Sequence, residues 1–497
     1  MARLIDAVEG RPRAAFAAFL ALHALVWTAL PSLLYANLPL DVIEAMTYGR
    51  EWVLGSDKLP PLPWYLAEIV YRITGIDDAL YALCQITVIV AFVLVWQTAR
   101  PLVGAAGALA AILIIDGMHF FASSATKFNH NVVELPFWAL AGFAFCGALR
   151  HGRLGQWAML GVALGLAFWA KYFVAVLAVP MALFLIADPA ARRSLRQGGP
   201  WLAAAVALAI AAPHLVWLAQ HHFPPLGYVE ERASPPRDLL DHLVRPAWFL
   251  GGQLLFLLPS LVIAAPLAWP QAKGVAAAQG DAFDRRIVSL LAFGPALTLF
   301  AFAFVTGRNT SAMWGFPLWL FLGLWIVMFA PAALDRRRLA AILALWATVF
   351  VISVGAFVAD YLVLPRFDHR YRAAFFPGDL LSVAITQRFE RATGHQPAYI
   401  IGSMWDAGNV AHYTRTRPQP HVLIDGSPRR SPWIDLDDLH ARGAALVWTD
   451  GDPRVLPHNL AAAAPGAEVG APFDLPYHGA GEGTVHVGWA LLRPRAP

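Results

Sequence analysis

Apolar residues fill long uninterrupted runs along most of this chain. A helix crosses a hydrocarbon layer of about 30 Å with roughly 20 apolar residues. Runs of that length occur at 14–35, 78–99, 101–121, 131–149, 201–220, 246–269, 287–306, 312–331 and 339–363. A further apolar run, 155–187, is interrupted by Lys171 and Tyr172 and predicts two short helices. The pattern therefore predicts a polytopic α-helical membrane protein with about eleven transmembrane helices.

The basic residues between the apolar runs favour one orientation. Cytoplasmic loops of membrane proteins are enriched in Lys and Arg. Dividing 155–187 into two helices places the basic clusters on one side, whereas a single helix there would move residues 336–338 to the other side. With the N-terminus cytoplasmic, the inside loops carry Arg11, Arg13, Arg100, Arg150, Arg153, Arg192, Arg193, Arg196, Lys273, Arg285, Arg286, Arg336, Arg337 and Arg338. The outside segments are then 37–77, 120–130, the break at Lys171, 221–245, 307–309 and everything after residue 364.

The last part of the chain has a different composition. Residues 365–497 contain no spanning run, and Gly, Pro, Asp and Arg become more frequent. Short β-like runs, PAYIIG, PHVLID, AALVWTD and VHVGWALL, alternate with helix-like stretches at Gly378–Thr393, Trp405–Tyr413 and Leu436–Arg442. Such alternation predicts a small α/β layer. We expect a transmembrane domain over 1–364 and a soluble domain over 365–497 on the outer side.

Composition narrows the functional class. The chain has 497 residues, of which 58% are hydrophobic and 14% charged, and its net charge is +4. Because the basic residues are scattered between apolar runs, topology explains them better than nucleic-acid binding. The 19 Trp and 30 Phe suit membrane-interface belts and ligand walls. Cys84 and Cys146 lie inside apolar runs and indicate neither a disulfide framework nor a metal cluster.

The first outside segment, 37–68, combines acids, bases and aromatics beside the membrane. Asp41 and Glu44 are three residues apart, so both carboxylates share one face if a helix begins there. The same spacing also fits a capping box, with the first acid at the N-cap. Lys58 stands before paired prolines that direct a following helix; such a residue is either a membrane-interface anchor or a phosphate contact.

Four other outside segments carry candidate side chains. Asn129, His130 and Asn131 can bind sugar hydroxyls, a phosphate or a metal, or else cap the next helix. Glu134, one turn further on, is expected to face the bundle interior.

Lys171 and Tyr172, at the break in 155–187, are expected to contact a phosphate. Arg308 offers a guanidinium suited to the same task or a simple topological anchor. Tyr228 and Glu230, from the 221–245 loop, are candidate acceptor-side contacts, and the adjacent histidines there are poor partners for one metal. The sequence assigns no cofactor with certainty and leaves a divalent metal open.

A family resemblance covers nearly the whole chain. The segment NLPLDVIEAMTYGREWVLGSDKLPPLPWYLAE resembles the first outside loop of bacterial GT-C glycosyltransferases, the protein mannosyltransferase, aminoarabinose transferase and lipopolysaccharide galacturonosyltransferase type. Further matching segments are FNHN, LAFWAKYF, PHLVWL, RNTSAMWGFPLW, FPGD and SPWID. The chain departs from its relatives at Leu59, where they usually carry His before the paired prolines, and at Asn129 and Asn131, where many carry an acid.

The resemblance implies an inverting glycosyltransferase that uses a polyprenyl-phosphate sugar donor and a lipid or polysaccharide acceptor. It implies a multi-pass protein of the bacterial inner membrane, with the active site and C-terminal domain periplasmic. On this analogy Asp41 is the general base, Glu44 stabilises developing positive charge, and Lys58, Lys171 and Arg308 hold the departing phosphate. The alternative is a lipid or solute transporter, which would place charges near the bilayer midplane and often show inverted repeats. We find no such repeat in the sequence.

Overall fold

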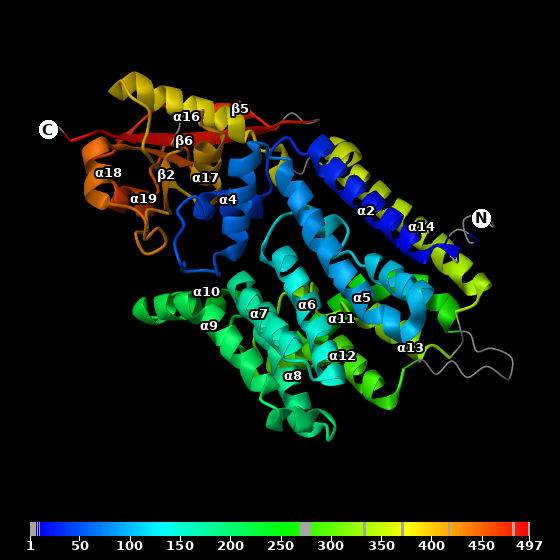
Figure 1. Cartoon of the computed structure of the whole chain (residues 1–497). Coiled ribbons are helices and arrows are strands. Elements are labelled where there is room, and N and C mark those ends of the chain that lie inside the picture. Colours follow the sequence, from blue (N-terminus) through cyan, green and yellow to red (C-terminus); the bar gives the residue numbers. More distant parts are fainter. Residues whose placement is uncertain are drawn as a thin grey trace.

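The structure is a computed structural model that describes residues 6, 8, 10–268, 280–331, 334–368, 372–415, 418–479 and 483–495. Lys273, part of the predicted inside pattern, lies outside the described residues. The described apolar helices form a bundle (Figure 1): α2 (Pro12–Leu34), α5 (Ala79–Asp116), α6 (His130–His151), α7 (Leu154–Ala170), α8 (Ala175–Ala187), α9 (Gly199–Gln220), α11 (Asp241–Ala264), α12 (Ala282–Thr306), α13 (Leu322–Phe329) and α14 (Arg336–Val358).

Seven of the described helices are long and apolar enough to cross a membrane, and two shorter apolar helices occupy Leu154–Ala170 and Tyr172–Ala187. The longest element, α5, contains a kink at Gly104, whose φ of 72° and ψ of 171° are readily reached only by glycine. Its two halves correspond to the predicted runs 78–99 and 101–121. The predicted break in 155–187 is confirmed, because α7 ends at Ala170 and Lys171 is extended.

The predicted run 312–331 forms less regular structure than a spanning helix. A 3₁₀ turn at Ala312–Gly315 is followed by turns, and helix α13 begins only at Leu322. Two residues account for the interruption. Pro317 lacks a backbone N–H, and a Cβ at Gly315 would lie 1.9 Å from Gln253 Oε1. The chain therefore approaches α11 closely at this point.

The bundle is most buried at α5 and α6. Helices α2 and α14 lie side by side at its edge (Figure 1), where the Trp27 ring contacts the rings of Phe350 and Phe357 edge-on. Far fewer residues of α14 are buried, which fits a helix with a wide face toward lipid. Four short helices connect or flank the bundle: α3 (Leu40–Gly49), α4 (Leu62–Thr74), α10 (Pro225–Arg232) and α15 (Pro365–Asp368).

The C-terminal part is a small α/β layer, as predicted. Its helices are α16 (Gly378–Thr393), α17 (Met404–Tyr413), α18 (Leu436–Arg442) and α19 (His458–Ala463). Its strands are β1 (Tyr399–Gly402), β2 (His421–Ile424), β3 (Ala444–Trp448), β4 (Glu468–Val469), β5 (Phe473–Pro476) and β6 (Thr484–Leu492). The sheet order is β2-β1-β3-β6-β4, with β5 paired to β6. Strands β1, β2 and β3 are parallel, and β6 is antiparallel to β3.

The sheet domain packs against the segment that follows α2 (Figure 1). The backbone N–H groups of Ala36 and Asn37 donate to Ala374 O at 2.9 and 3.0 Å. Leu38 N donates to Tyr413 Oη at 2.9 Å, and helix α17 packs on α3. The C-terminal domain therefore fixes the position of α3, which carries the first two candidate carboxylates.

Candidate active site

A cavity of about 1190 Å³ lies between the first loop, α6, α8, α10, α12 and α14. It exceeds the usual range of roughly 300–1,000 Å³ for small-molecule pockets, so it can hold a larger ligand. Most side chains that the sequence singles out line it: Asp41, Glu44, Lys58, Asn129, His130, Asn131, Lys171, Tyr172 and Tyr228. Glu230 and Arg308 are not among the lining residues.

Helix α3 presents both predicted carboxylates to the cavity. The capping-box interpretation is wrong, because α3 begins at Leu40 with Pro39 at the N-cap, and no side chain caps it. Because the backbone of Pro39 is extended, the helix starts at Leu40, one residue before Asp41. Asp41 is half-buried, and its Oδ2 accepts a hydrogen bond of 2.9 Å from Asn129 Nδ2. This bond fixes the carboxylate and occupies one of its two oxygens.

Glu44 holds Lys58 at the cavity wall. The Lys58 ammonium forms an ion pair with Glu44 Oε2 and lies 5.4 Å from the centroid of the Tyr228 ring. Burial raises the pKa of Glu44, while the neighbouring Lys58 charge opposes that rise. Ser56 Oγ accepts from the backbone N–H groups of Lys58 and Leu59 and so shapes the turn.

Asn129 caps helix α6, which is one of the roles that the sequence left open, and it also contacts Asp41. Its Oδ1 caps α6 by accepting from the N–H groups of Asn131 and Val132, at 2.9 and 3.2 Å. Its Nδ2 donates to Asp41, so the same side chain joins α6 to α3. His130 is buried, and its Nε2 lies 3.0 Å from Pro60 O.

Lys171 is held by two partners from α6. Its Nζ donates to Asn131 Oδ1 at 2.5 Å and lies 3.2 Å from Glu134 Oε1. Glu134 faces the bundle interior, as predicted, and its side chain is fully buried. A continuous set of hydrogen bonds therefore runs from Asp41 through Asn129 and Asn131 to Lys171.

Tyr172 is hydrogen-bonded to a histidine that the sequence did not single out. Its hydroxyl lies 2.8 Å from Nε2 of His214 in α9, and Nδ1 of the same ring lies 2.6 Å from Leu54 O. The signal in the sequence was the apolar PHLVWL run, where a histidine interrupts a spanning helix.

Helix α10 supplies a cation that sequence reasoning also missed. Arg232 lines the cavity, and its Nε donates to Tyr228 Oη at 3.3 Å. The i, i+4 spacing of these residues on one short helix was the available signal. Arg308 instead donates to Ala233 O at 2.8 Å, beside the cavity wall, and Glu230 is exposed.

The described residues contain no group of three or more His, Cys, Asp and Glu side chains placed to hold a metal ion. The half-buried Asp41 carboxylate lines the same cavity as the basic side chains of Lys58, Lys127, Lys171 and Arg232. Such an arrangement can accept a proton at one end and bind an anion at the other.

The fold and the site define a polytopic membrane protein with a large cavity lined by charged and apolar side chains, and with a C-terminal α/β domain. Residues 58–217 match the family model of dolichyl-phosphate-mannose-protein mannosyltransferase. Lipopolysaccharide core galacturonosyltransferase RgtB of Rhizobium johnstonii is 24% identical over 479 residues, which cover 91% of this chain and 92% of RgtB. Lipid A galacturonosyltransferase RgtD of the same organism is 29% identical over 187 residues, 36% of this chain and 38% of RgtD.

A solved structure matches over almost the whole length. ArnT from Cupriavidus metallidurans, crystallised with undecaprenyl phosphate, has a TM-score of 0.63 at 13% identity, covering 97% of this chain and 99% of ArnT. This match shows that the chain has the fold of ArnT. Together the matches confirm the predicted resemblance to GT-C glycosyltransferases and the predicted fold class, a GT-C membrane bundle with a small C-terminal sheet domain.

Proposed function

We propose that the protein transfers a sugar from a polyprenyl-phosphate donor to a hydroxyl of a lipid or polysaccharide acceptor. The observation that carries the proposal is the shared cavity, in which the Asp41 carboxylate faces Lys58, Lys171 and Arg232. The names of the matching relatives favour a glycosyltransferase over the transporter alternative. Those names also make a lipopolysaccharide core or lipid A the most suitable acceptor class, and a uronic acid the most suitable sugar.

The reaction needs a proton acceptor and an anion-binding region. Asp41 takes the proton from the acceptor hydroxyl as its oxygen attacks the anomeric carbon of the sugar. The bond between that carbon and the phosphate oxygen breaks, and its electron pair leaves with the polyprenyl phosphate. Lys58, Lys171 and Arg232 stabilise the added negative charge. Attack opposite the leaving phosphate inverts the configuration at the anomeric carbon.

Several predicted roles change in this scheme. Glu44 pairs with Lys58, so we assign it to positioning that ammonium group rather than to the anomeric carbon. Asn129 orients Asp41, and Asn131 and Glu134 hold Lys171. Arg232 takes the place that the sequence suggested for Arg308.

The proposed location is the bacterial inner membrane. Two observations support a periplasmic cavity: the basic residues predicted to be inside, and the C-terminal domain packed beside the first loop. On this orientation, residues 1–364 form the catalytic bundle, and residues 365–497 form a periplasmic domain.

The test is transfer of labelled sugar from an undecaprenyl-phosphate donor to a lipopolysaccharide acceptor by purified protein. We expect Asp41→Asn to lower the transfer rate by at least about 100-fold, within the range that a positioned general base contributes, while donor binding stays close to that of the wild type. Glu231→Gln is the matched control, because Glu231 is exposed and does not line the cavity. Full transfer by Asp41→Asn would remove this carboxylate from the mechanism.

A further inference from the structure

His214 is a fully buried ring in the C-terminal half of α9, surrounded by aromatic side chains. The rings of Trp169 and Tyr172 lie 5.3 and 5.7 Å away by centroid, and the Tyr172 ring is nearly parallel to the imidazole at 9°. The rings of Phe168 and Trp217 lie 5.7 and 6.2 Å away. No carboxylate is among its hydrogen-bond or ion-pair partners in the described part of the chain. An uncompensated charge on this ring would therefore be costly, so the ring is neutral.

The partners of the two ring nitrogens fix where the protons are. Leu54 O is only an acceptor, so Nδ1 of His214 must carry the single proton of the neutral ring. Nε2 is then an acceptor, and the Tyr172 hydroxyl must donate to it. Tyr172 has one hydroxyl proton, and this bond uses it. Its oxygen keeps only lone pairs for any other partner.

This result changes the role of Tyr172, which the sequence suggested as a phosphate contact. An ester phosphate offers acceptor oxygens and needs a donor, whereas a sugar hydroxyl can donate to an oxygen. We infer that Tyr172 accepts a hydrogen bond from a sugar hydroxyl of the substrate and that His214 is the positioning residue that enforces this polarity. The inference rests on the proposed function and adds a specificity-determining contact to it.

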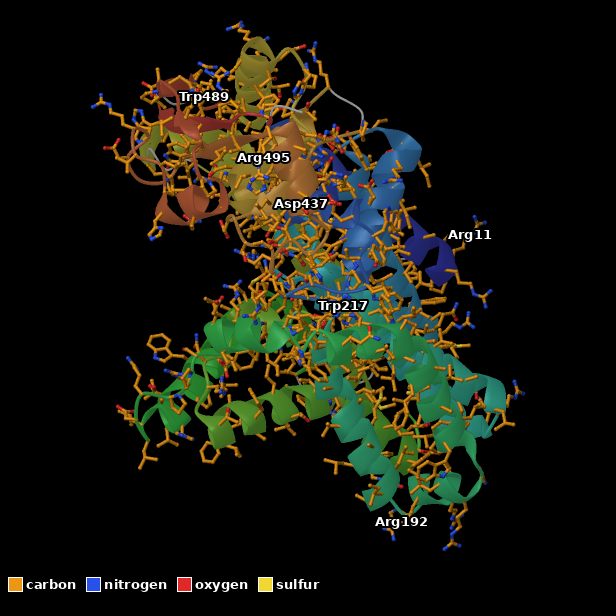
Figure 2. The ribbon with its side chains drawn as sticks, turned by 90° about the vertical axis from the view of Figure 1, so that its left-hand side faces the viewer. Arg11, Arg192, Trp217, Asp437, Trp489 and Arg495 are labelled. Carbon is orange, nitrogen blue, oxygen red and sulfur yellow. The ribbon has the colours of Figure 1, made fainter. Side chains whose placement is uncertain are left out.

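The surroundings of His214 explain how the polarity is maintained. The Nδ1 bond ties the imidazole to the loop that carries Lys58. The same loop packs tightly on α9, because a Cβ at Gly55 would lie 2.1 Å from the Trp217 ring. Figure 2 shows Trp217 between the C-terminal domain and the helical end that carries Arg192. Tyr172 is thus connected through His214 to the loop that carries Lys58, and both Tyr172 and Lys58 line the cavity.

Three variants test the inference in purified protein with undecaprenyl phosphate and its sugar-linked form. Tyr172→Phe should leave the Kd for bare undecaprenyl phosphate within about two-fold of the wild type. It should raise one KM for transfer by about 3- to 10-fold, the worth of one neutral hydrogen bond, with a smaller change in kcat. A rise in the donor KM assigns the hydroxyl to the donor sugar, and a rise in the acceptor KM assigns it to the acceptor.

His214→Asn tests whether the histidine acts through Tyr172. The amide keeps a donor toward Leu54 O and removes the acceptor from Tyr172, so it should raise the same KM about three-fold or more. In a Tyr172→Phe background it should add less than two-fold, because the contact is already absent. Tyr65→Phe is the matched control: its hydroxyl donates to Val53 O in the same loop, but Tyr65 does not line the cavity.

The outcomes separate this inference from the proposed function. Weaker binding of bare undecaprenyl phosphate by Tyr172→Phe would show that the hydroxyl donates to phosphate and overturn the inference. Unchanged KM values in Tyr172→Phe, or equal effects of His214→Asn in both backgrounds, would overturn it as well. If the wild type fails to bind undecaprenyl phosphate, the proposed donor class is wrong and the inference falls with it.

Discussion

Replacing Lys171 by methionine should affect both the stability of the protein and its binding of the donor. Lys171 is the charged partner of Glu134, whose side chain is fully buried, whereas 11% of the Lys171 side chain is exposed. Oε2 of Glu134 has no hydrogen-bond partner among the described residues. Lys171→Met therefore leaves a buried carboxylate with no counter-charge. It also removes one of the three cations proposed to bind the donor phosphate.

Two different magnitudes are expected. Breaking a buried ion pair by removing one partner typically costs about 3–5 kcal/mol of stability, because the remaining charge stays buried. Losing a charge-assisted hydrogen bond to phosphate costs about 1.5–3 kcal/mol, which corresponds to a rise of about 10- to 150-fold in the donor KM. If Lys171 contacts the donor, the rise in the donor KM is independent of the loss of stability.

The double variant Lys171→Met/Glu134→Gln separates them. It removes the charge that Lys171→Met alone leaves unpaired, so its thermal unfolding midpoint in detergent should return most of the way to that of the wild type. Its donor KM should stay as high as that of Lys171→Met. Unfolding is followed by intrinsic fluorescence, and KM is measured by labelled sugar transfer at saturating acceptor.

Two results would refute this reasoning. Recovery of the wild-type donor KM in the double variant would show that Lys171 serves only to balance Glu134. An unfolding midpoint for Lys171→Met equal to that of the wild type would show that the buried pair does not carry the stability assigned to it.

Two further predictions concern the C-terminal domain. Burial raises the pKa of Asp406 from 3.8 to about 6, so its contribution to stability is present below about pH 4 and is lost as pH rises through 6. Relative to the wild type, Asp406→Asn should therefore gain up to about 3 kcal/mol of stability between about pH 4 and 8, and a pH-independent difference in unfolding midpoints would contradict this. Arg430 Nε lies 3.2 Å from Asp57 Oδ2, next to Lys58, and is partly exposed. Arg430→Ala should raise the donor KM by about two- to five-fold with little change in kcat, and an unchanged KM would mean that this contact does not position the loop.

The membrane helices and the C-terminal elements could be predicted from sequence because each leaves a local signal. A bilayer requires long apolar runs, and the break at Lys171 stands out because a charge there is costly. The residue range of α16 was predicted correctly, because apolar periodicity and a following glycine mark a helix and its end. Strands β4 and β5 were missed, since they are short and largely exposed.

The candidate site was predicted only in part, because its contacts depend on packing between distant segments. Asp41 and Asn129 are 88 positions apart, and no local pattern shows that they share a hydrogen bond. Arg308 and Arg232 both lie next to turns. The sequence does not reveal that the Arg232 side chain reaches the cavity and the Arg308 side chain does not. The prediction of a capping box at Asp41 was wrong, because α3 begins at Leu40, directly after Pro39.

The most direct measurement of the central claim follows both products of the reaction in one sample. Purified protein is mixed with a sugar-labelled undecaprenyl-phosphate donor and a lipopolysaccharide acceptor, and released undecaprenyl phosphate and glycosylated acceptor are quantified by mass spectrometry. The account predicts that the two appear in equal amounts with the wild type and that both form at least about 100-fold more slowly with Asp41→Asn. Glycosylated acceptor formed at the wild-type rate by Asp41→Asn, or release of undecaprenyl phosphate without a glycosylated product, would contradict it.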